Sequence, residues 1–509
     1  IGRITQGSSL ALAWPFTFVG AVSCLVVLVM WASRTTLRET VFLLLGAGVY
    51  STWAGGVVWG RIYKSPLFTE MLIGPGVVHH DVLPLAAMSN MLRTYHVASP
   101  GLDGIPYLAY HWGSQWLFAQ LANLTGESVL QFYQLGYVTT WVPLFFGTVV
   151  AFAVQASPEG RSAIRRFSFW AVFLAATVGV LPIVGMDALG VWTSNLMISE
   201  SYGVVMPAAL MVLATTIAFW RERGSDVRAG NFSPLDYLFL AVFLPASIVT
   251  LGYIKISLMI LGFVATMYAG IRMKAWRRWQ FLVVGALIAA AVAVAYPRVA
   301  LVAHEEGIVP LDFLKGFVPQ VWWPFFFLIH LFWSLLYVVL RLRREGARTI
   351  ADLIALMRAE RILDVEIVAL IAIVGVLPGL VIHIDGGSAF YFSDVQRWLA
   401  VGLLLAGATT LLPTVGPVRF SSLKTLGLLF IAAPLALSMA RNSVHWTTIM
   451  LKANAELRLS LYPPDVAARI PPGMRSLPHL ADHAMLEAGL GRSRNFGPVE
   501  GLLSLANMP

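Results

Sequence analysis

Residues 235–272 read LDYLFLAVFLPASIVTLGYIKISLMILGFVATMYAGIR, two apolar runs separated by little more than Lys255. Each run has the length of a helix that crosses the hydrocarbon core of a bilayer, about 17–25 residues. Similar runs recur along the 509 residues, of which 58% are hydrophobic and 12% are charged. Soluble domains carry about 25% charged residues. The sequence therefore predicts an all-α, polytopic membrane helix bundle.

The apolar runs predict about twelve membrane spans within residues 1–440. A polar tail, 441–509, follows them and is expected on the extracytoplasmic side. Because the chain begins with Ile1 rather than Met, we expect a further segment upstream. The expected spans are 13–32, 40–60, 129–154, 167–186, 202–220, 235–252, 256–272, 280–302, 321–341, 365–383, 398–412 and 425–440.

Basic residues fall mainly in alternate loops, including 221–228, 272–278 and 341–361. Loops enriched in Lys and Arg stay in the cytoplasm, so this set is predicted to be cytoplasmic. Within the last of them, the apolar spacing of residues 345–362 predicts a helix lying at the membrane surface. The net charge of +9 reflects this asymmetry and does not predict nucleic-acid binding. The opposite, extracytoplasmic face is then predicted to carry the loop at 61–128, the turns near 187–201, 303–320 and 384–397, and the tail.

The first large extracytoplasmic loop holds the densest group of chemically active side chains. Residues 79–126 read HHDVLPLAAMSNMLRTYHVASPGLDGIPYLAYHWGSQWLFAQLANLTG. Apolar residues at helical spacing after Asp81 predict an interfacial amphipathic helix, with Asp81 at its start. A carboxylate there can act as a general base, bind a divalent cation such as Mg²⁺, or only cap the helix. His79 and His80 adjoin it, but adjacent side chains diverge, so no metal site is assigned to them.

Further candidates follow in the same loop and between two later spans. Asp103 lies in a Gly- and Pro-rich segment, and Tyr110 and His111 open the next apolar stretch. Aromatic rings with one polar edge suit sugar stacking and equally suit an interfacial aromatic belt. Lys255 lies near membrane depth, where it favours an anionic phosphate or caps a tight helical hairpin.

The late extracytoplasmic loop, HIDGGSAFYFSDVQR at 383–397, supplies the last candidates. Asp385, Tyr391 and Arg397 follow one another closely after a Gly-Gly turn. The planar guanidinium of Arg397 can clamp a lipid phosphate, or the side chain can extend to the interface. His330, in WWPFFFLIHLFW, is predicted to be a packed core histidine.

This layout resembles the GT-C superfamily of polyprenyl-phosphate-dependent glycosyltransferases. In that family an acidic residue precedes an interfacial helix in the first large extracytoplasmic loop, the position of Asp81. The Tyr-rich stretch YLAYHWGSQWLFAQLANLTG and the later group Tyr391, Phe392 and Arg397 are also similar to the family. The paired acid that the family often has is absent, since His80 precedes Asp81 and Val82 follows it.

The resemblance implies a multi-pass protein of the bacterial inner membrane, with its active site on the periplasmic face. Its donor would be a polyprenyl-phosphate sugar, and its partners would be that donor and membrane lipids. Asp81 would deprotonate an acceptor hydroxyl, and Arg397 or Lys255 would stabilise the departing phosphate. His79, His80 or His111 would position sugar hydroxyls.

Three alternatives remain open at this point. A transporter requires charged or broken helices at mid-membrane, whereas the ionisable residues here cluster toward one face. A membrane O-acyltransferase requires a buried histidine base, for which His330 is the intraspan candidate. A non-enzymatic subunit of a larger membrane assembly requires neither feature.

Overall fold

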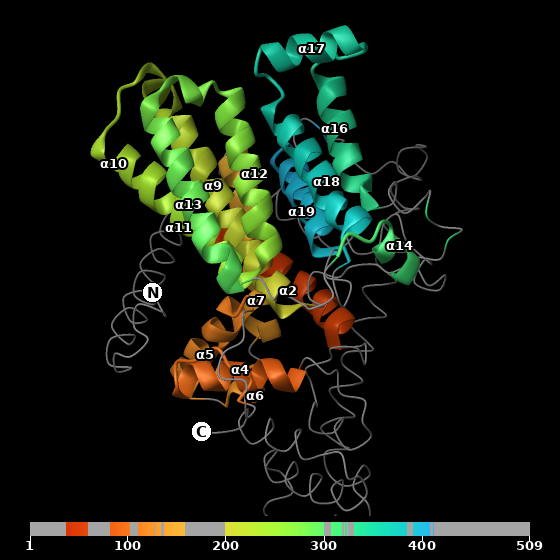
Figure 1. Ribbon diagram of the computed structural model, residues 1–509. Helices are drawn as coiled ribbons and strands as arrows, with labels where there is room; N and C mark the ends of the chain where they lie inside the picture. Colours follow the sequence, from red (N-terminus) through yellow and green to blue (C-terminus); the bar gives the residue numbers. More distant parts are fainter. Residues whose placement is uncertain are drawn as a thin grey trace, which may run out of the picture. The chain divides into compact units, whose positions relative to one another are not determined.

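The computed structural model describes residues 37–59, 82–101, 110–126, 128–133, 137–157, 199–299, 307–317, 330–383 and 390–407, and the single residues 320, 323 and 411. Every regular element in these ranges is helical (Figure 1), which confirms the all-α prediction for them. One isolated antiparallel bridge joins Ile308 to Ile382. The helices are α2 (Leu37–Trp59), α4 (Val82–Thr94), α5 (Gly113–Thr125), α6 (Val129–Gln131), α7 (Tyr137–Ala156), α9 (Glu200–Ala229), α10 (Pro234–Tyr237), η5 (Leu238–Phe243), α11 (Leu244–Ile254), α12 (Ile256–Arg272), η6 (Ala275–Arg277), α13 (Trp279–Val299), α14 (Asp312–Phe317), α16 (Phe332–Arg344), α17 (Ile350–Arg358), α18 (Leu363–Val381) and α19 (Phe390–Ala406).

Four helical segments of the described ranges are long and apolar enough to cross a membrane, namely Glu200–Ala229, Pro234–Ile254, Trp279–Val299 and Leu363–Val381. On α13 large apolar side chains are left uncovered, for example Leu282 at 57% exposed. Such a surface is unfavourable in water and suits hydrocarbon. These helices indicate a membrane-embedded protein. The count of twelve spans stays a prediction, because the expected spans 13–32, 167–186 and 425–440 lie outside the described residues.

The chain divides into two compact units. Unit 1 consists of Ile1–Leu108, Trp112–Pro143 and Leu437–Pro509, and unit 2 of Ala109–His111 and Leu144–Ala436. The expected boundary at 440 stays a prediction, because it lies outside the described residues. The expected tail, 441–509, lies outside the described residues, so its character stays a prediction.

Unit 1 contains the helix predicted after Asp81. Helix α4 begins at Val82 and packs against α5 and α6. Its middle turns, from Leu85 to Asn90, are buried on every side, whereas an interfacial amphipathic helix leaves one face uncovered. The helix is therefore confirmed, and its place at the membrane surface stays a prediction.

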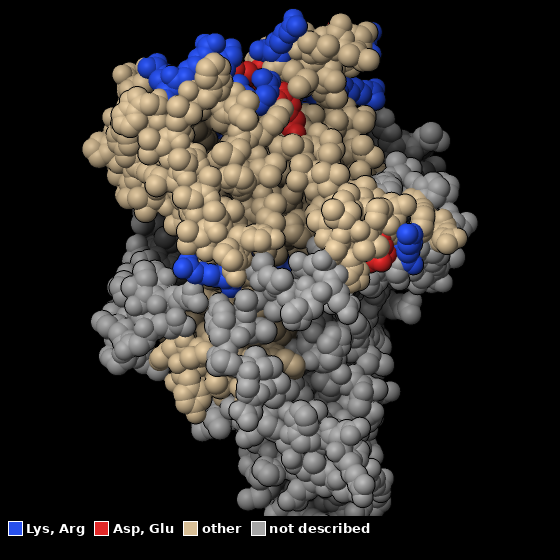
Figure 2. All heavy atoms as spheres, in the orientation of Figure 1, with Lys and Arg blue, Asp and Glu red and all other residues tan. Residues whose placement is uncertain are grey.

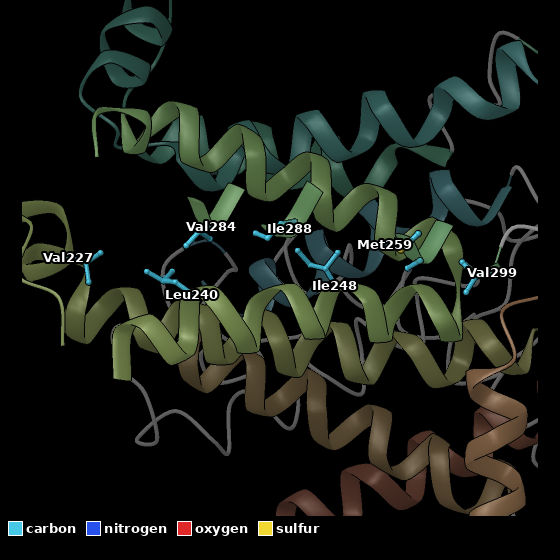
Figure 3. Close-up of a cluster of buried hydrophobic side chains, with 8 residues drawn as sticks. Val227, Leu240, Ile248, Met259, Val284, Ile288 and Val299 are labelled. Atoms are coloured by element: carbon cyan, nitrogen blue, oxygen red, sulfur yellow. The ribbon is translucent and has the colours of Figure 1, made fainter. Parts of the chain in front are cut away.

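Unit 2 is an assembly of packed helices in which α11 lies against α9, α12 and α13 (Figure 1). The apolar core between them is formed by side chains from each of these helices and from η5 (Figure 3). Helices α16, α18 and α19 pack against one another, and α12 joins α18 and α19 to the first group. The core residues are Val227, Leu240, Ile248, Met259, Val284, Ile288, Ala295 and Val299.

One end of unit 2 is rich in arginine. The last turns of α9, α12 and α16 carry Arg228, Arg272 and Arg341, and Figure 2 shows Lys and Arg gathered at this end. Helix α17 lies across the same end (Figure 1). We call it the basic end. The grouping agrees with the alternation of basic loops in the sequence, while the side of the membrane on which it lies stays a prediction.

Candidate functional site

The structure describes five of the ten sequence-predicted site residues. Tyr110, His111, Lys255, Tyr391 and Arg397 lie in the described ranges of unit 2. The other five lie outside the described residues, and these are His79, His80, Asp81, Asp103 and Asp385.

The late group of candidates is helical rather than part of a loop. The prediction placed residues 384–397 in an extracytoplasmic turn and began the next span at 398, but α19 begins at Phe390. Tyr391, Asp394 and Arg397 therefore lie in its first turns, and all three are buried. The prediction was wrong because charged residues lower the local hydropathy even where their charges are paired inside the protein.

Close contact between α18 and α19 is what buries this group. Gly375 of α18 lies so near the backbone of α19 that a Cβ there would meet the carbonyl oxygen of Phe392 at 2.5 Å and the Cα of Ser393 at 3.2 Å. A glycine is needed because any side chain would push the helices apart. This approach turns the polar side of α19 toward α16.

Arg397 is the centre of a buried polar network, the α16–α19 cluster, formed by His330, Ser334, Ser393, Asp394, Gln396 and Arg397. Its guanidinium donates to the carbonyl oxygen of His330 (3.2 Å) and to His330 Nδ1 (2.6 Å). It also lies 3.2 Å from Asp394 Oδ1. Gln396 donates to the same carbonyl oxygen at 2.9 Å, and Ser334 donates to the amide oxygen of Gln396. Arg397 therefore holds α19 to the start of α16.

These contacts fix the tautomer of His330. A guanidinium only donates hydrogen bonds, so Nδ1 of His330 accepts and the ring proton lies on Nε2. Nε2 is 2.7 Å from Ser393 Oγ, so the ring donates to the hydroxyl. A base that activates serine must instead accept the hydroxyl proton at that nitrogen. This arrangement counts against His330 as the base of an acyl transfer.

Lys255 lies at a break between two helices. It is the single extended residue (φ −156°) between α11 and α12, and its side chain is buried. Its Nζ lies 3.9 Å from the ring centroid of Tyr391, a cation–π contact. The Tyr391 ring is in turn 5.4 Å from that of Tyr202, near the start of α9. The structure thus brings together Lys255 and Tyr391, two of the sequence-predicted site residues.

Tyr110 and His111 form a separate pair. Their ring centroids are 3.8 Å apart in an edge-to-face arrangement, and His111 is buried. A stacking surface for a sugar requires an uncovered ring face. Convergence of this pair with Lys255 or with Asp81 stays a prediction.

The start of α9, which includes Glu200 of the turn expected on the extracytoplasmic face, is buried, and this burial was not predicted. Ser199 caps this helix by accepting from the backbone N–H of Tyr202, and Ser199, Glu200 and Ser201 are all buried. The sequence signal for a helix start is Ser199 followed by Glu200, just before an apolar run. Asp394 belongs to the late group that was expected in a turn; in α19 its spacing of three residues from Arg397 places both on one side of the helix.

No metal-binding group was found in the part of the chain that the structure describes: no three His, Cys, Asp or Glu side chains converge there. A partly exposed pair does occur, where His383 Nδ1 lies 2.5 Å from Asp312 Oδ2 near the end of α18. The expectation of a divalent cation concerns Asp81, outside the described residues.

Comparisons with models of protein families, with curated proteins and with solved structures find no match to this chain. The chemistry of its buried side chains is therefore the basis for assigning a function. Two cations, Lys255 and Arg397, are buried in unit 2, and buried ionisable groups in membrane helices are usually functional.

Proposed function

We propose that this protein is an integral membrane glycosyltransferase of GT-C type that takes a sugar from a polyprenyl-phosphate donor. The acceptor would be glycosylated on the extracytoplasmic face of a bacterial inner membrane. The single observation that carries the proposal is the pair of buried cations, Lys255 directly before α12 and Arg397 in the third turn of α19. Lys255 lies at the end of α12 opposite Arg272 of the basic end. If the basic end is cytoplasmic, Lys255 therefore lies toward the outer leaflet, where an anionic phosphate of a lipid donor would lie.

The two cations are assigned different parts. Arg397 is a positioning residue, because its guanidinium already bonds His330 and approaches Asp394. Lys255 is the better candidate for the departing phosphate, since an ammonium is a compact charge with three donors on a flexible stem. Its Nζ lies over the ring of Tyr391, which is another of the sequence-predicted site residues.

The proposed reaction is a direct displacement at the anomeric carbon. The Asp81 carboxylate takes the proton of an acceptor hydroxyl, whose oxygen forms a new bond to that carbon. The bond from carbon to the phosphate oxygen breaks, and the electron pair leaves with the polyprenyl phosphate. Lys255 stabilises the charge that develops there. No cofactor is assigned, and a divalent cation such as Mg²⁺ on Asp81 remains an option.

Lys255→Met tests the proposal, because Met keeps the length of the side chain and removes the charge. Purified protein in nanodiscs is assayed for sugar transfer from a mixed pool of polyprenyl-phosphate sugars. Loss of about two to three orders of magnitude in turnover is expected, as for removal of one electrostatic stabiliser. Lys274→Met, at the basic end, is the matched control and should retain turnover. Equal turnover in both variants would refute the role of Lys255, and no transfer by the unmodified protein would refute the proposed function.

A transporter is the second candidate. The observation that favours it is the buried ion pair of Asp394 and Arg397 inside α19, since a path for a polar substrate needs charged groups within helices. Uptake of labelled sugar phosphates into proteoliposomes, without sugar transfer to an acceptor, would favour this alternative.

A further inference from the structure

Helix α17 has an apolar side that the protein covers only in part. Leu356 is buried and Leu353 and Met357 are half-buried, on the side of the helix that faces unit 2. Ile350 and Ile354 continue this apolar arc around the helix but are 77% and 44% exposed. At about 100° per residue the two isoleucines lie on one flank, one turn apart. An uncovered flank of this kind needs an apolar neighbour.

The orientation of α17 is fixed by the rest of unit 2. Its first turn is closed by a capping box, in which Thr349 accepts from the N–H of Asp352 and Asp352 accepts from the N–H of Thr349. Near its other end, Arg272 of α12 donates to the carbonyl oxygen of Met357 at 2.6 Å. Held in this way, α17 lies across the ends of α16 and α18 (Figure 1). A helix that crosses the ends of membrane spans runs along the plane of the membrane surface.

The surroundings of this flank are positively charged. The segment 341–361 contains six arginines and three carboxylates. Glu345 is bound by Arg341 and Arg361, and Asp352 by backbone N–H groups, so these two carboxylates are occupied. Within the described residues, no carboxylate forms a salt bridge with any of three exposed arginines, Arg343, Arg348 and Arg358. Their charges are therefore available to an anionic partner.

We propose that α17 is a docking helix for anionic glycerophospholipids. Ile350 and Ile354 enter the boundary between headgroups and acyl chains, while Arg348 and Arg358 bind lipid phosphates. An apolar flank bordered by arginines on a helix at the membrane surface matches both parts of such a lipid. The surface is continuous with the membrane that surrounds the apolar helices, so the lipid reaches it without a soluble partner.

Spin labels on the full-length protein in nanodiscs test the proposal. In a Cys24→Ser background, single cysteines replace Ile350, Ile354 or Ala355, and the discs contain phosphatidylcholine with increasing phosphatidylglycerol. The labels at the two isoleucine positions should collide more with oxygen, which enters lipid, than with a water-soluble nickel reagent. The label at Ala355, which is exposed and lies about 100–140° around the helix from the two isoleucines, should show the reverse and serves as the matched control.

Charge removal tests the lipid headgroup contribution. The measured value is the phosphatidylglycerol fraction at which the ratio of oxygen to nickel collisions, for the label at residue 354, has made half of its change. Arg348→Gln with Arg358→Gln should raise this fraction about fivefold for each charge, equivalent to about 1 kcal/mol. Lys274→Gln with Arg277→Gln removes the same charge at η6 and should leave this value unchanged.

Three results would overturn the proposal. The isoleucine labels could report water in discs rich in phosphatidylglycerol, or the two double variants could behave alike. A label shielded from both reagents would show that another protein, or a second copy of this chain, covers the flank.

Discussion

Replacement of Arg272 by Met should destabilise unit 2 by about 3 kcal/mol, because it leaves Glu366 buried without its cation. Arg272 donates to both carboxylate oxygens of Glu366, and Tyr268 donates to the same group at 2.6 Å. The Glu366 side chain is only 4% exposed and that of Arg272 is 24% exposed. Loss of one partner of a buried pair costs about 3–5 kcal/mol, and the partial exposure of Arg272 favours the lower value.

A double-mutant cycle separates the stranded charge from other effects. Glu366→Gln in the Arg272→Met background removes the uncompensated charge, while the amide still accepts from Tyr268. The double variant should therefore regain about 2 kcal/mol of the loss. Unfolding free energies are measured by titrating dodecyl maltoside micelles with dodecyl sulfate and following tryptophan fluorescence.

Arg277→Met is the matched control for this cycle. Arg277 lies on η6 at the same end, and its described contact is with the ring of Trp276. Its replacement should change the unfolding free energy by no more than about 0.5–1 kcal/mol. The reasoning is refuted if the effects of Arg272→Met and Glu366→Gln simply add, since a buried pair requires coupling.

Three further outcomes are expected. Gly375→Ala should lower the unfolding free energy by about 1–3 kcal/mol, because the added Cβ collides with the backbone at Phe392. Gly270→Ala has open space around it and should raise the unfolding free energy by about 0.5–1 kcal/mol. Thermal melting of both variants would show whether the close approach of α18 and α19 exists. Backbone N–H groups hold the pKa of Asp352 below its usual range, so its stabilisation of α17 is present above about pH 4, the value in the unfolded chain, and is lost as the pH falls further. Hydrogen exchange, corrected for intrinsic rates, should show that the first turn of α17 loses protection only below about pH 4. Loss of protection already at pH 6 would contradict this. Ser393→Ala should lower stability by about 1–3 kcal/mol while turnover in sugar transfer is kept, since the hydroxyl accepts from its histidine partner; loss of turnover without loss of stability would contradict a purely structural role of Ser393.

The positions of several helices could be predicted from the sequence because hydropathy is a local property. The expected spans 235–252, 256–272 and 280–302 correspond to Pro234–Ile254, α12 and α13 within a few residues. The break at Lys255 was also visible, since one polar residue interrupts two apolar runs. These features depend on residues that are neighbours in the chain.

The burial of the polar groups could not be predicted in the same way. His330 and Arg397 are 67 residues apart, and nothing in either local sequence states that one will bond the other. The same holds for α4, whose Ser89 and Asn90 are polar and yet buried. Both cases depend on which surfaces meet, and a single sequence does not contain that information in a local pattern.

The polar residues of α19, which hid the start of that helix in the sequence, take part in the packing of the helices. In hydrocarbon, apolar side chains gain little by leaving lipid for protein, so close backbone contact and interhelical hydrogen bonds select the partner of each helix. Gly375 permits the contact of α18 with α19, and Arg397 and Gln396 bond the carbonyl oxygen of His330 next to α16. Each of these residues lowers the apparent membrane propensity of its own segment. Low hydropathy at the start of α19 is therefore the expected consequence of a specific contact among three helices.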